Sequence, residues 1–110
     1  MKKAAREAQI MVVIKNPGEA PRIEPLFENT LEAFQAAVGG YIEAVTVCSD
    51  MAIICNEEGR LRALPYNTNI CGCSFFGPIL IVGVDGEDFA SLNWGGLAIA
   101  QQMLGEEATP

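Results

Sequence analysis

The stretch NTLEAFQAAVGGYIEAVTV, residues 29–47, predicts a helix, a stop and a strand in immediate succession. Asn29 is a natural N-cap, because its side-chain oxygen can accept a hydrogen bond from an amide of the first helical turn. Glu32, three residues later, can bond back to the Asn29 amide as in a capping box. The apolar residues that fall on one face at helical spacing are Leu31, Phe34 and Val38. We therefore predict that Asn29 caps a helix.

The double glycine Gly39-Gly40 predicts the end of this helix. One of the two is expected in the left-handed conformation, which side chains disfavour. The residues that follow, 41–47, are rich in β-branched and aromatic side chains and predict a strand.

Before this unit, residues 9–15, QIMVVIK, form an apolar run that predicts a buried strand. Asn16-Pro17-Gly18 then predicts a turn. Residues 22–27 alternate in polarity, but Pro21 and Pro25 remove backbone donors from the ladder. We therefore expect this segment at an edge of the sheet or as an extended arm.

After it, residues 51–55 are apolar and predict another strand. The turn NEEG, residues 56–59, ends in Gly59, which suits a positive φ. Residues 60–64 alternate between polar and apolar, as a half-exposed strand does. These signals predict that residues 41–64 form a three-stranded antiparallel meander.

The passage YNTNICGCSFFG, residues 66–77, follows neither period and is interpreted as a loop. Residues 79–84, ILIVGV, predict a central strand. Asp85-Gly86 should turn the chain, and Asp88 is placed as the cap of a short turn. Residues 94–104 resemble a helix that Gly105 stops.

These elements predict a single α+β domain with an antiparallel or mixed sheet of about five strands. The helix at residues 30–38 is expected on one face, with the C-terminal helix beside it. We place a flexible lead-in at residues 1–8, the domain at 9–104 and a frayed tail at 105–110. No apolar run approaches the roughly 20 residues that a membrane span needs, so a cytoplasmic location in a bacterial host is expected.

The net charge of −7 is distributed unevenly along the chain. Residues 1–22 have a net charge of +3, whereas from residue 23 onward twelve acids face only Arg60 and Arg62. Direct nucleic-acid binding needs a basic stripe, so that class is disfavoured. The acidic surface serves solubility, or it competes with nucleic acid for a basic partner.

The four cysteines do not predict a metal site or a disulfide framework. A zinc site would use pairs spaced by two to four residues, whereas here one pair is seven apart and the other reads C-G-C. No oxidising compartment is implied either. The cysteines, Cys48, Cys55, Cys71 and Cys73, are interpreted as small apolar residues, one or two of them near a loop.

The sequence contains few groups of residues that could form a catalytic site. The chain has no histidine, which is the commonest general base near neutral pH. The carboxylates cluster in turns, and no phosphate-binding glycine motif occurs. Cys71 or Cys73 could serve as a nucleophile, but no base partner is evident. We therefore expect a protein without enzymatic activity and without a cofactor.

The passage at residues 66–77 is long for a connection and is therefore a candidate binding segment. Its aromatic and amide side chains suit a small polar ligand or another chain. The alternative is that Phe75 and Phe76 enter the core while the asparagines bond to their own backbone. The candidate ligand- or partner-binding residues are Tyr66, Asn67, Asn69, Arg62 and Asn56.

Several short motifs resemble the domain of unknown function 3846 family. They are VGGYIEAV (38–45), NEEG (56–59), Asn67, GPILIVG (77–83) and DGEDFASL (85–92). The resemblance covers roughly residues 9–93, and the NICGCSFF passage within it is less typical of the family. It implies a setting in bacteriophages or mobile elements, with no established activity.

Together these observations predict a non-enzymatic accessory protein of a phage or mobile element that acts by binding. It would capture a small ligand, as a homo-oligomer with a pocket at subunit boundaries, or occlude a host protein. The remaining alternatives are an interaction domain of another role and a small enzyme that uses Cys71 or Cys73.

Overall fold

The structure is a computed structural model that describes residues 7–106 and 108. Most of the predicted lead-in (1–6) and part of the predicted tail (107, 109 and 110) lie outside the described residues. In chain order the elements are β1 (Gln9–Lys15), β2 (Arg22–Glu28), α1 (Leu31–Val38), β3 (Ile42–Cys48), β4 (Met51–Asn56), β5 (Tyr66–Ile70), β6 (Cys73–Phe76), β7 (Ile79–Asp85), β8 (Asp88–Ala90) and α2 (Trp94–Leu104).

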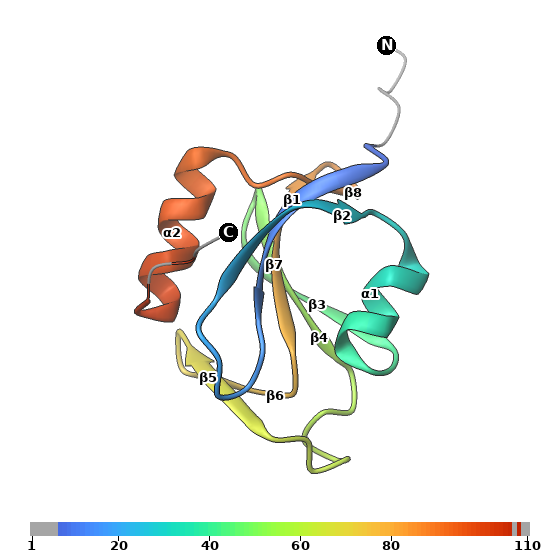
Figure 1. Cartoon of the computed structure of the whole chain (residues 1–110), viewed down its shortest axis with the longest axis vertical. Helices are drawn as coiled ribbons and strands as arrows, with labels where there is room; N and C mark the ends of the chain where they lie inside the picture. Colours follow the sequence, from blue (N-terminus) through green and yellow to red (C-terminus); the bar gives the residue numbers. More distant parts are fainter. Residues whose placement is uncertain (1–6, 107, 109–110) are drawn as a thin grey trace.

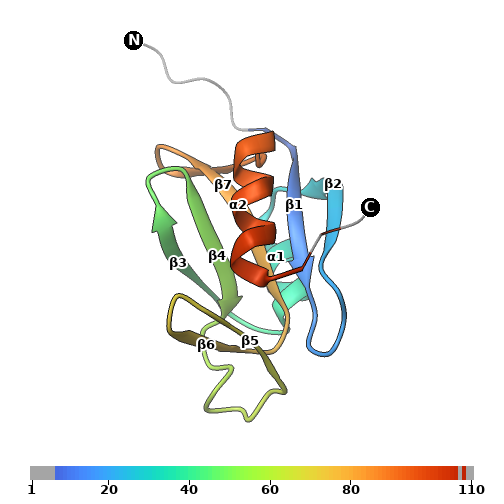
Figure 2. The same ribbon diagram turned by 90° about the vertical axis from the view of Figure 1, so that its left-hand side faces the viewer.

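An antiparallel sheet organises the described part of the chain. Five strands follow the order β2-β1-β7-β4-β3, and the short strand β8 pairs with the end of β7 (Figure 2). The apolar strands β1, β7 and β4 lie inside the sheet, while β2 and β3 form its edges. The predicted α+β class, the central position of β7 and the edge position of β2 are confirmed.

Each face of the sheet carries one of the helices (Figure 1). Side chains alternate between faces along a strand, so β4 supplies Ile54 to one core and Ile53 to the other. Phe34 and Val38 of α1 pack in the first core, whereas Leu97 of α2 packs in the second. The two helices are therefore on opposite faces, and our expectation that they lie beside one another was wrong.

Helix α1 begins one residue later than predicted. Thr30 is its N-cap, and the Thr30 hydroxyl accepts a hydrogen bond from the Ala33 amide at 3.1 Å. Asn29 is therefore not the cap, and its amide nitrogen instead donates to the carbonyl oxygens of Glu7 and Phe89. The predicted stop is confirmed, since Gly39 adopts φ 77°.

The predicted three-stranded meander is wrong in its third strand. Strands β3 and β4 form a hairpin, but the chain from residue 57 to 63 is a succession of turns. Gly59 is needed for a close approach and not for a positive φ, since a β-carbon there would lie 2.6 Å from the Phe76 backbone oxygen. Leu61 is 85% exposed and contributes little to the core.

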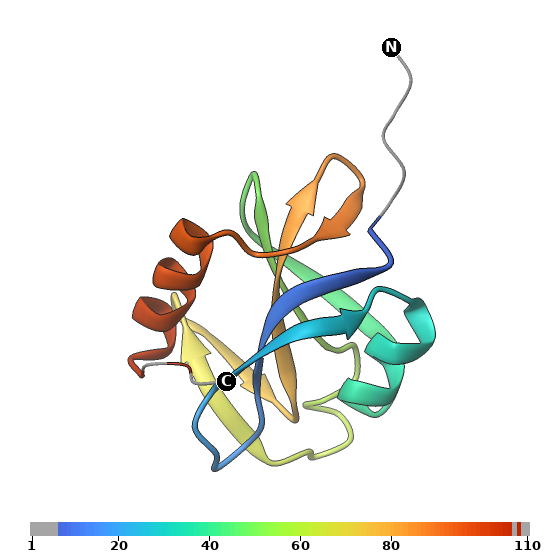
Figure 3. The same cartoon turned by 45° about the horizontal axis from the view of Figure 1, so that its top comes forward.

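The passage interpreted as a loop is a second hairpin. Strand β5 pairs with β6, and the turn between them places Cys71 at φ 51° and Gly72 at φ 85°. In Figure 3 this hairpin crosses the sheet on the side that α2 occupies. It forms a separate two-stranded sheet.

The predicted strand at 79–84 and the predicted helix at 94–104 are confirmed, whereas Asp88 has another role. Ala108, in the predicted frayed tail, is 5% exposed, and its amide donates to the Gln101 side-chain oxygen at 2.9 Å. Asn93 caps α2 by accepting a hydrogen bond from the Gly96 amide, and Gly105 ends the helix at φ 71°. Asp88 does not cap a turn, because it is the first residue of β8. No helix in the described ranges has the length and apolar character of a membrane span.

Candidate functional site

Two adjoining hollows lie between the β3–β4 hairpin and the β5–β6 hairpin. They have volumes of about 270 Å³ and about 220 Å³, and both are lined by Val45, Cys73 and Phe75. The larger one continues toward Glu43 and Arg60, and the smaller one toward Val47. We call these two hollows together the β3 furrow.

Asn67 anchors the β5–β6 hairpin through its amide nitrogen, while its side-chain oxygen is buried and accepts no hydrogen bond from the described residues. Its amide nitrogen donates to the backbone oxygens of Lys15 at 2.7 Å and of Gly77 at 2.8 Å. The side chain is only 9% exposed. Asn67 therefore ties the second hairpin to β1, which fixes one wall of the furrow.

The side chain of Asn56 also makes hydrogen bonds within the fold. Its amide nitrogen donates to Val38 at the end of α1, and its side-chain oxygen accepts from the Glu58 amide at 2.8 Å. It lines the larger hollow but is 6% exposed. Both of its polar atoms are already bonded within the chain.

The other three predicted residues are on the surface and do not form one site. Asn69 bonds to Ser74 and to the Gly72 amide, so it shapes the turn of its hairpin. Arg62 pairs with Glu58 at 3.4 Å and does not line the furrow. Tyr66 is 55% exposed, with its ring edge-on to Phe76 at 5.7 Å.

Arg60, which packs on Phe76, is the furrow residue that the sequence did not indicate. The Arg60 guanidinium lies 4.9 Å from the centre of the Phe76 ring, within the range of cation–π attraction. The alternative that both phenylalanines enter the core is correct for Phe75, whereas Phe76 is only partly buried. No sequence signal links residues sixteen positions apart once 60–64 is taken as a strand.

All four cysteines lie in the described part and carry free thiols. Burial raises the pKa of Cys55 to about 11, and nearby Glu43 and Cys73 add to this effect. A thiol that resists ionisation is a poor nucleophile, so Cys55 acts as a core residue. Within residues 7–106 and 108, no three cysteine or carboxylate side chains are grouped so that they could hold a metal ion.

The outer edge of β3 adjoins the furrow, and in the described chain no strand pairs with it. The Glu57 amide donates to the Tyr41 carbonyl at 2.9 Å, which marks this pair as a hydrogen-bonded one. Hydrogen-bonded and non-bonded pairs alternate along an antiparallel ladder. The backbone groups that point outward from β3 are therefore those of Ile42, Ala44 and Thr46.

The charge beside this edge is acidic. Glu43 is exposed on the furrow side, and Glu57 and Asp50 are exposed where the β3–β4 hairpin begins and ends its pairing. Arg60 is the cation that lines the furrow, and it lies against Phe76. A partner side chain that binds next to Glu43 would therefore face a negatively charged carboxylate.

A family model described as "Domain of unknown function (DUF3846)" matches residues 10–103. This span is most of the chain, and it confirms the family resemblance drawn from the motifs. No curated protein and no solved structure matches the chain.

Proposed function

Since the chain belongs to the DUF3846 family, which has no assigned function, we propose that it is a non-enzymatic accessory protein that acts by binding. The partner is a host protein, and the setting is a phage or mobile element, as the family resemblance implies. The β3 furrow is the binding surface.

The shape of the furrow carries this proposal. Its hollows of about 270 Å³ and about 220 Å³ are smaller than the roughly 300–1,000 Å³ typical of small-molecule pockets. They adjoin one another along β3 and share Val45. A polypeptide laid along both would contact more of this surface than a small molecule held in one.

Charge supports a basic partner. The chain carries −7 in total, and the exposed carboxylate of Glu43 lines the furrow. Opposite charges raise the rate of encounter and select against acidic partners. Occlusion of a basic surface of a host protein is consistent with this pattern.

The enzyme alternative rests on Cys71 or Cys73 as a nucleophile. Both thiols line the furrow and are exposed. A thiol nucleophile needs a base or a cation that favours the thiolate; the chain has no histidine, and Arg60, which lines the same hollow as Cys73, lies against the Phe76 ring. The binding proposal uses these cysteines as contact surface only.

Ligand capture by a homo-oligomer is the second candidate, and helix α2 is the observation that favours it. None of its residues is charged, although Trp94 is 78% exposed and Ile99 is 45% exposed. Surface helices usually carry charged residues on their outer face. Light scattering tests this candidate, which requires an oligomer that a Trp94→Glu substitution dissociates.

The binding proposal is tested by affinity capture from bacterial lysate with a matched pair of variants. Val45→Glu places a charge in the furrow, whereas Leu26→Glu places one on the exposed surface of β2. The wild type and Leu26→Glu should retain the same host protein, and Val45→Glu should lose it while keeping its circular dichroism spectrum.

A thermal-shift panel of nucleotides separates the alternatives. A ligand at 100 times its Kd adds about 2.7 kcal/mol to the native state, which is a readily measured shift. Such a shift, with no host protein captured, would favour ligand capture. Turnover that disappears in Cys71→Ser or Cys73→Ser would contradict a non-enzymatic role.

A further inference from the structure

We propose that the partner binds by adding an extended, basic segment to the free edge of β3, as an antiparallel strand whose alternate side chains enter the β3 furrow. This inference rests on the proposed binding function and specifies its mode. Strand addition of this kind uses main-chain hydrogen bonds for affinity and side-chain pockets for specificity.

The first argument is that β3 lacks most of the features that keep edge strands from pairing, since its one irregularity lies near its end, between Thr46 and Cys48. Proteins protect their edges with proline, lysine, inward charges or a covering segment. The sequence of β3, IEAVTVC, has no proline and no lysine, and Glu43 is its one charged residue. No strand of the described chain covers its outer side.

The second argument is the direction of the backbone groups. The N–H and C=O of Ile42, Ala44 and Thr46 point away from β4 and are spaced by two residues. The side chains of Ala44 and Thr46 are exposed and small, so they would not obstruct an approaching strand. Every strand pair in this fold is antiparallel, and an antiparallel addition continues the same ladder.

The third argument fixes the sequence pattern of the partner. Glu43, Val45 and Val47 alternate with the outward-bonding residues along β3, and Val45 and Val47 pack against the furrow-side core. Side chains of the added strand that are opposite these three residues project on the same face. An antiparallel partner therefore carries apolar, apolar and basic residues at every second position, in the order V-x-V-x-K.

Charge decides between a partner of this kind and a second copy of the chain. Two copies carry −7 each, so pairing β3 with itself brings two acidic surfaces together. A lysine or arginine placed opposite Glu43 instead faces an exposed carboxylate. The structure thus favours a basic segment of another protein.

The test uses the synthetic peptide TVTVTKT, acetylated and amidated, titrated into the full chain and followed by nuclear magnetic resonance. We expect shift changes concentrated on β3 and at least tenfold slower hydrogen exchange at the amides of Ile42, Ala44 and Thr46. The acidic counterpart TVTVTET should bind at least tenfold more weakly. Shift changes centred on another element, or equal binding of both peptides, would overturn the proposal.

Two N-methylated peptides test the backbone contacts without altering the protein. Methylation at the central threonines removes amides that face β3 in the proposed register, and methylation at the valines removes amides that face away. The first peptide should lose at least tenfold in affinity and the second should bind as the parent does. If the first binds as tightly as the parent, strand addition is wrong.

Protein variants supply the matched control. Ala44→Pro removes an outward amide, and Glu43→Lys reverses the charge; each should weaken TVTVTKT at least tenfold. Glu28→Lys makes the same charge change on β2 and should have no effect. If Ala44→Pro does not fold, the N-methylated peptides still decide the question.

Affinity capture from lysate with the Ala44→Pro variant separates this inference from the proposed function. If a host protein is captured from lysate by wild type and Ala44→Pro alike, binding stands and strand addition fails. If the free chain protects its own β3 amides as its concentration rises, the occupant is a second copy, and the inference is wrong.

Discussion

The two edges of the sheet are built differently, and the contrast shows where the molecule is open to a partner. Strand β2 contains Pro25, which lacks an amide to donate, and its pairing with β1 is interrupted by an irregularity between Ile10 and Val12. Strand β3 also has an irregularity, between Thr46 and Cys48, but it has no proline and lies beside a furrow. One edge is closed to further pairing and the other is not.

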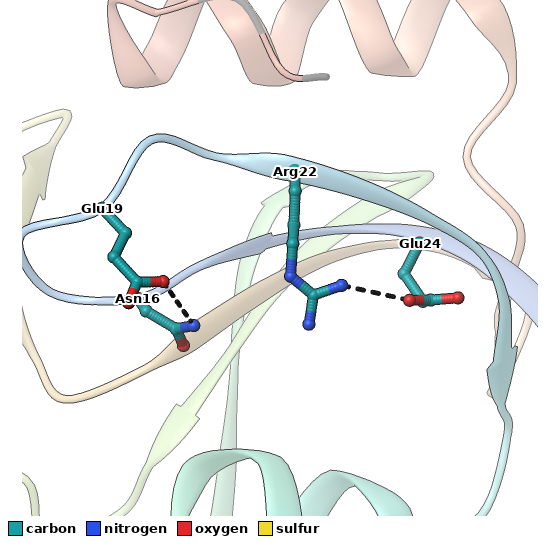
Figure 4. A network of polar contacts seen from close by, with 4 residues as sticks. All are labelled: Asn16, Glu19, Arg22 and Glu24. Atoms are coloured by element: carbon teal, nitrogen blue, oxygen red, sulfur yellow. Dashed lines mark hydrogen bonds and ion pairs between the residues drawn. The ribbon is translucent and has the colours of Figure 1, made fainter. Parts of the chain in front are cut away.

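Polar contacts reinforce the closed edge. Arg22 pairs with Glu24 at 3.1 Å within β2, and Asn16 bonds to Glu19 at 3.1 Å in the turn before it (Figure 4). Exposed pairs of this kind contribute little to stability. Their charge still makes β2 a poor template for another strand, which β3 is not.

The largest effect is expected from detaching the wall of the furrow. Asn67→Ala leaves the carbonyls of Lys15 and Gly77 without the amide that joins them. Buried groups left unpaired cost about 1–3 kcal/mol, and removal of the unpaired Asn67 side-chain oxygen offsets part of this cost, so the free energy of unfolding should fall by about 1–2 kcal/mol in urea denaturation. Asn69→Ala, at an exposed turn, should change it by less than about 1 kcal/mol; equal effects would mean that Asn67 does not anchor the hairpin.

A smaller effect on the free energy of unfolding is expected from ionisation of the Cys55 thiol in β4. The pKa of Cys55 is raised from 9.0 to about 11 in the folded chain, so the unfolded chain ionises first as pH rises. The contribution of Cys55 is fully present below about pH 9 and is lost as pH rises toward 11. Urea denaturation of the wild type should show this fall, and Cys55→Ala should show a shallower one. Parallel curves would contradict the burial of this thiol.

Opening the closed edge should change association more than stability. Pro25→Val gives β2 a backbone amide at this position and adds a β-branched side chain. The substitution should change the free energy of unfolding by less than about 1 kcal/mol. We expect self-association that rises with protein concentration, measured by sedimentation velocity, where the wild type shows less. Unchanged sedimentation would mean that proline is not what closes this edge.

The smallest effect is expected from the ion pair on β2. Arg22→Ala removes a contact whose side chains are 49% and 36% exposed, so the unfolding free energy should change by less than about 0.5 kcal/mol. Thermal denaturation at low and high salt provides the measurement. A loss above about 1 kcal/mol would show that the pair stabilises the fold as well as covering the edge.

Local signals were sufficient for the elements that bury apolar side chains or end in glycine. The apolar runs of β1 and β7, the left-handed Gly39 and the helix that Gly105 ends were all predictable, because each depends on neighbouring residues alone. Asn29 was misassigned because a good capping residue can also bond to distant carbonyls, here those of Glu7 and Phe89.

The second hairpin was not predictable, because its stability comes from elsewhere in the fold. Asparagines disfavour strands, yet Asn67 remains in β5 because its amide bonds to the Lys15 carbonyl of β1. The alternation at residues 60–64 was misleading, since Leu61 points to solvent. In consequence the furrow, and Arg60 over Phe76, could not be seen from the sequence.

The sequence also could not predict that β3 has an unpaired edge, because strand order is a property of the whole sheet. The sequence of β3 resembles that of many internal strands, and only its position outside β4 leaves Ala44 and Thr46 with unpaired outward groups. Tyr66 and Asn69 were proposed as binding residues from composition, and the structure places them at the surface of the second hairpin.

Residue-resolved hydrogen exchange of the two edges, in the free chain and with the captured host protein, tests the central claim most directly. We predict fast exchange at the amides of Ile42, Ala44 and Thr46 in the free chain, slowed at least tenfold in the complex, with β2 unchanged. Slowed exchange at β2 with none at β3 would contradict the account.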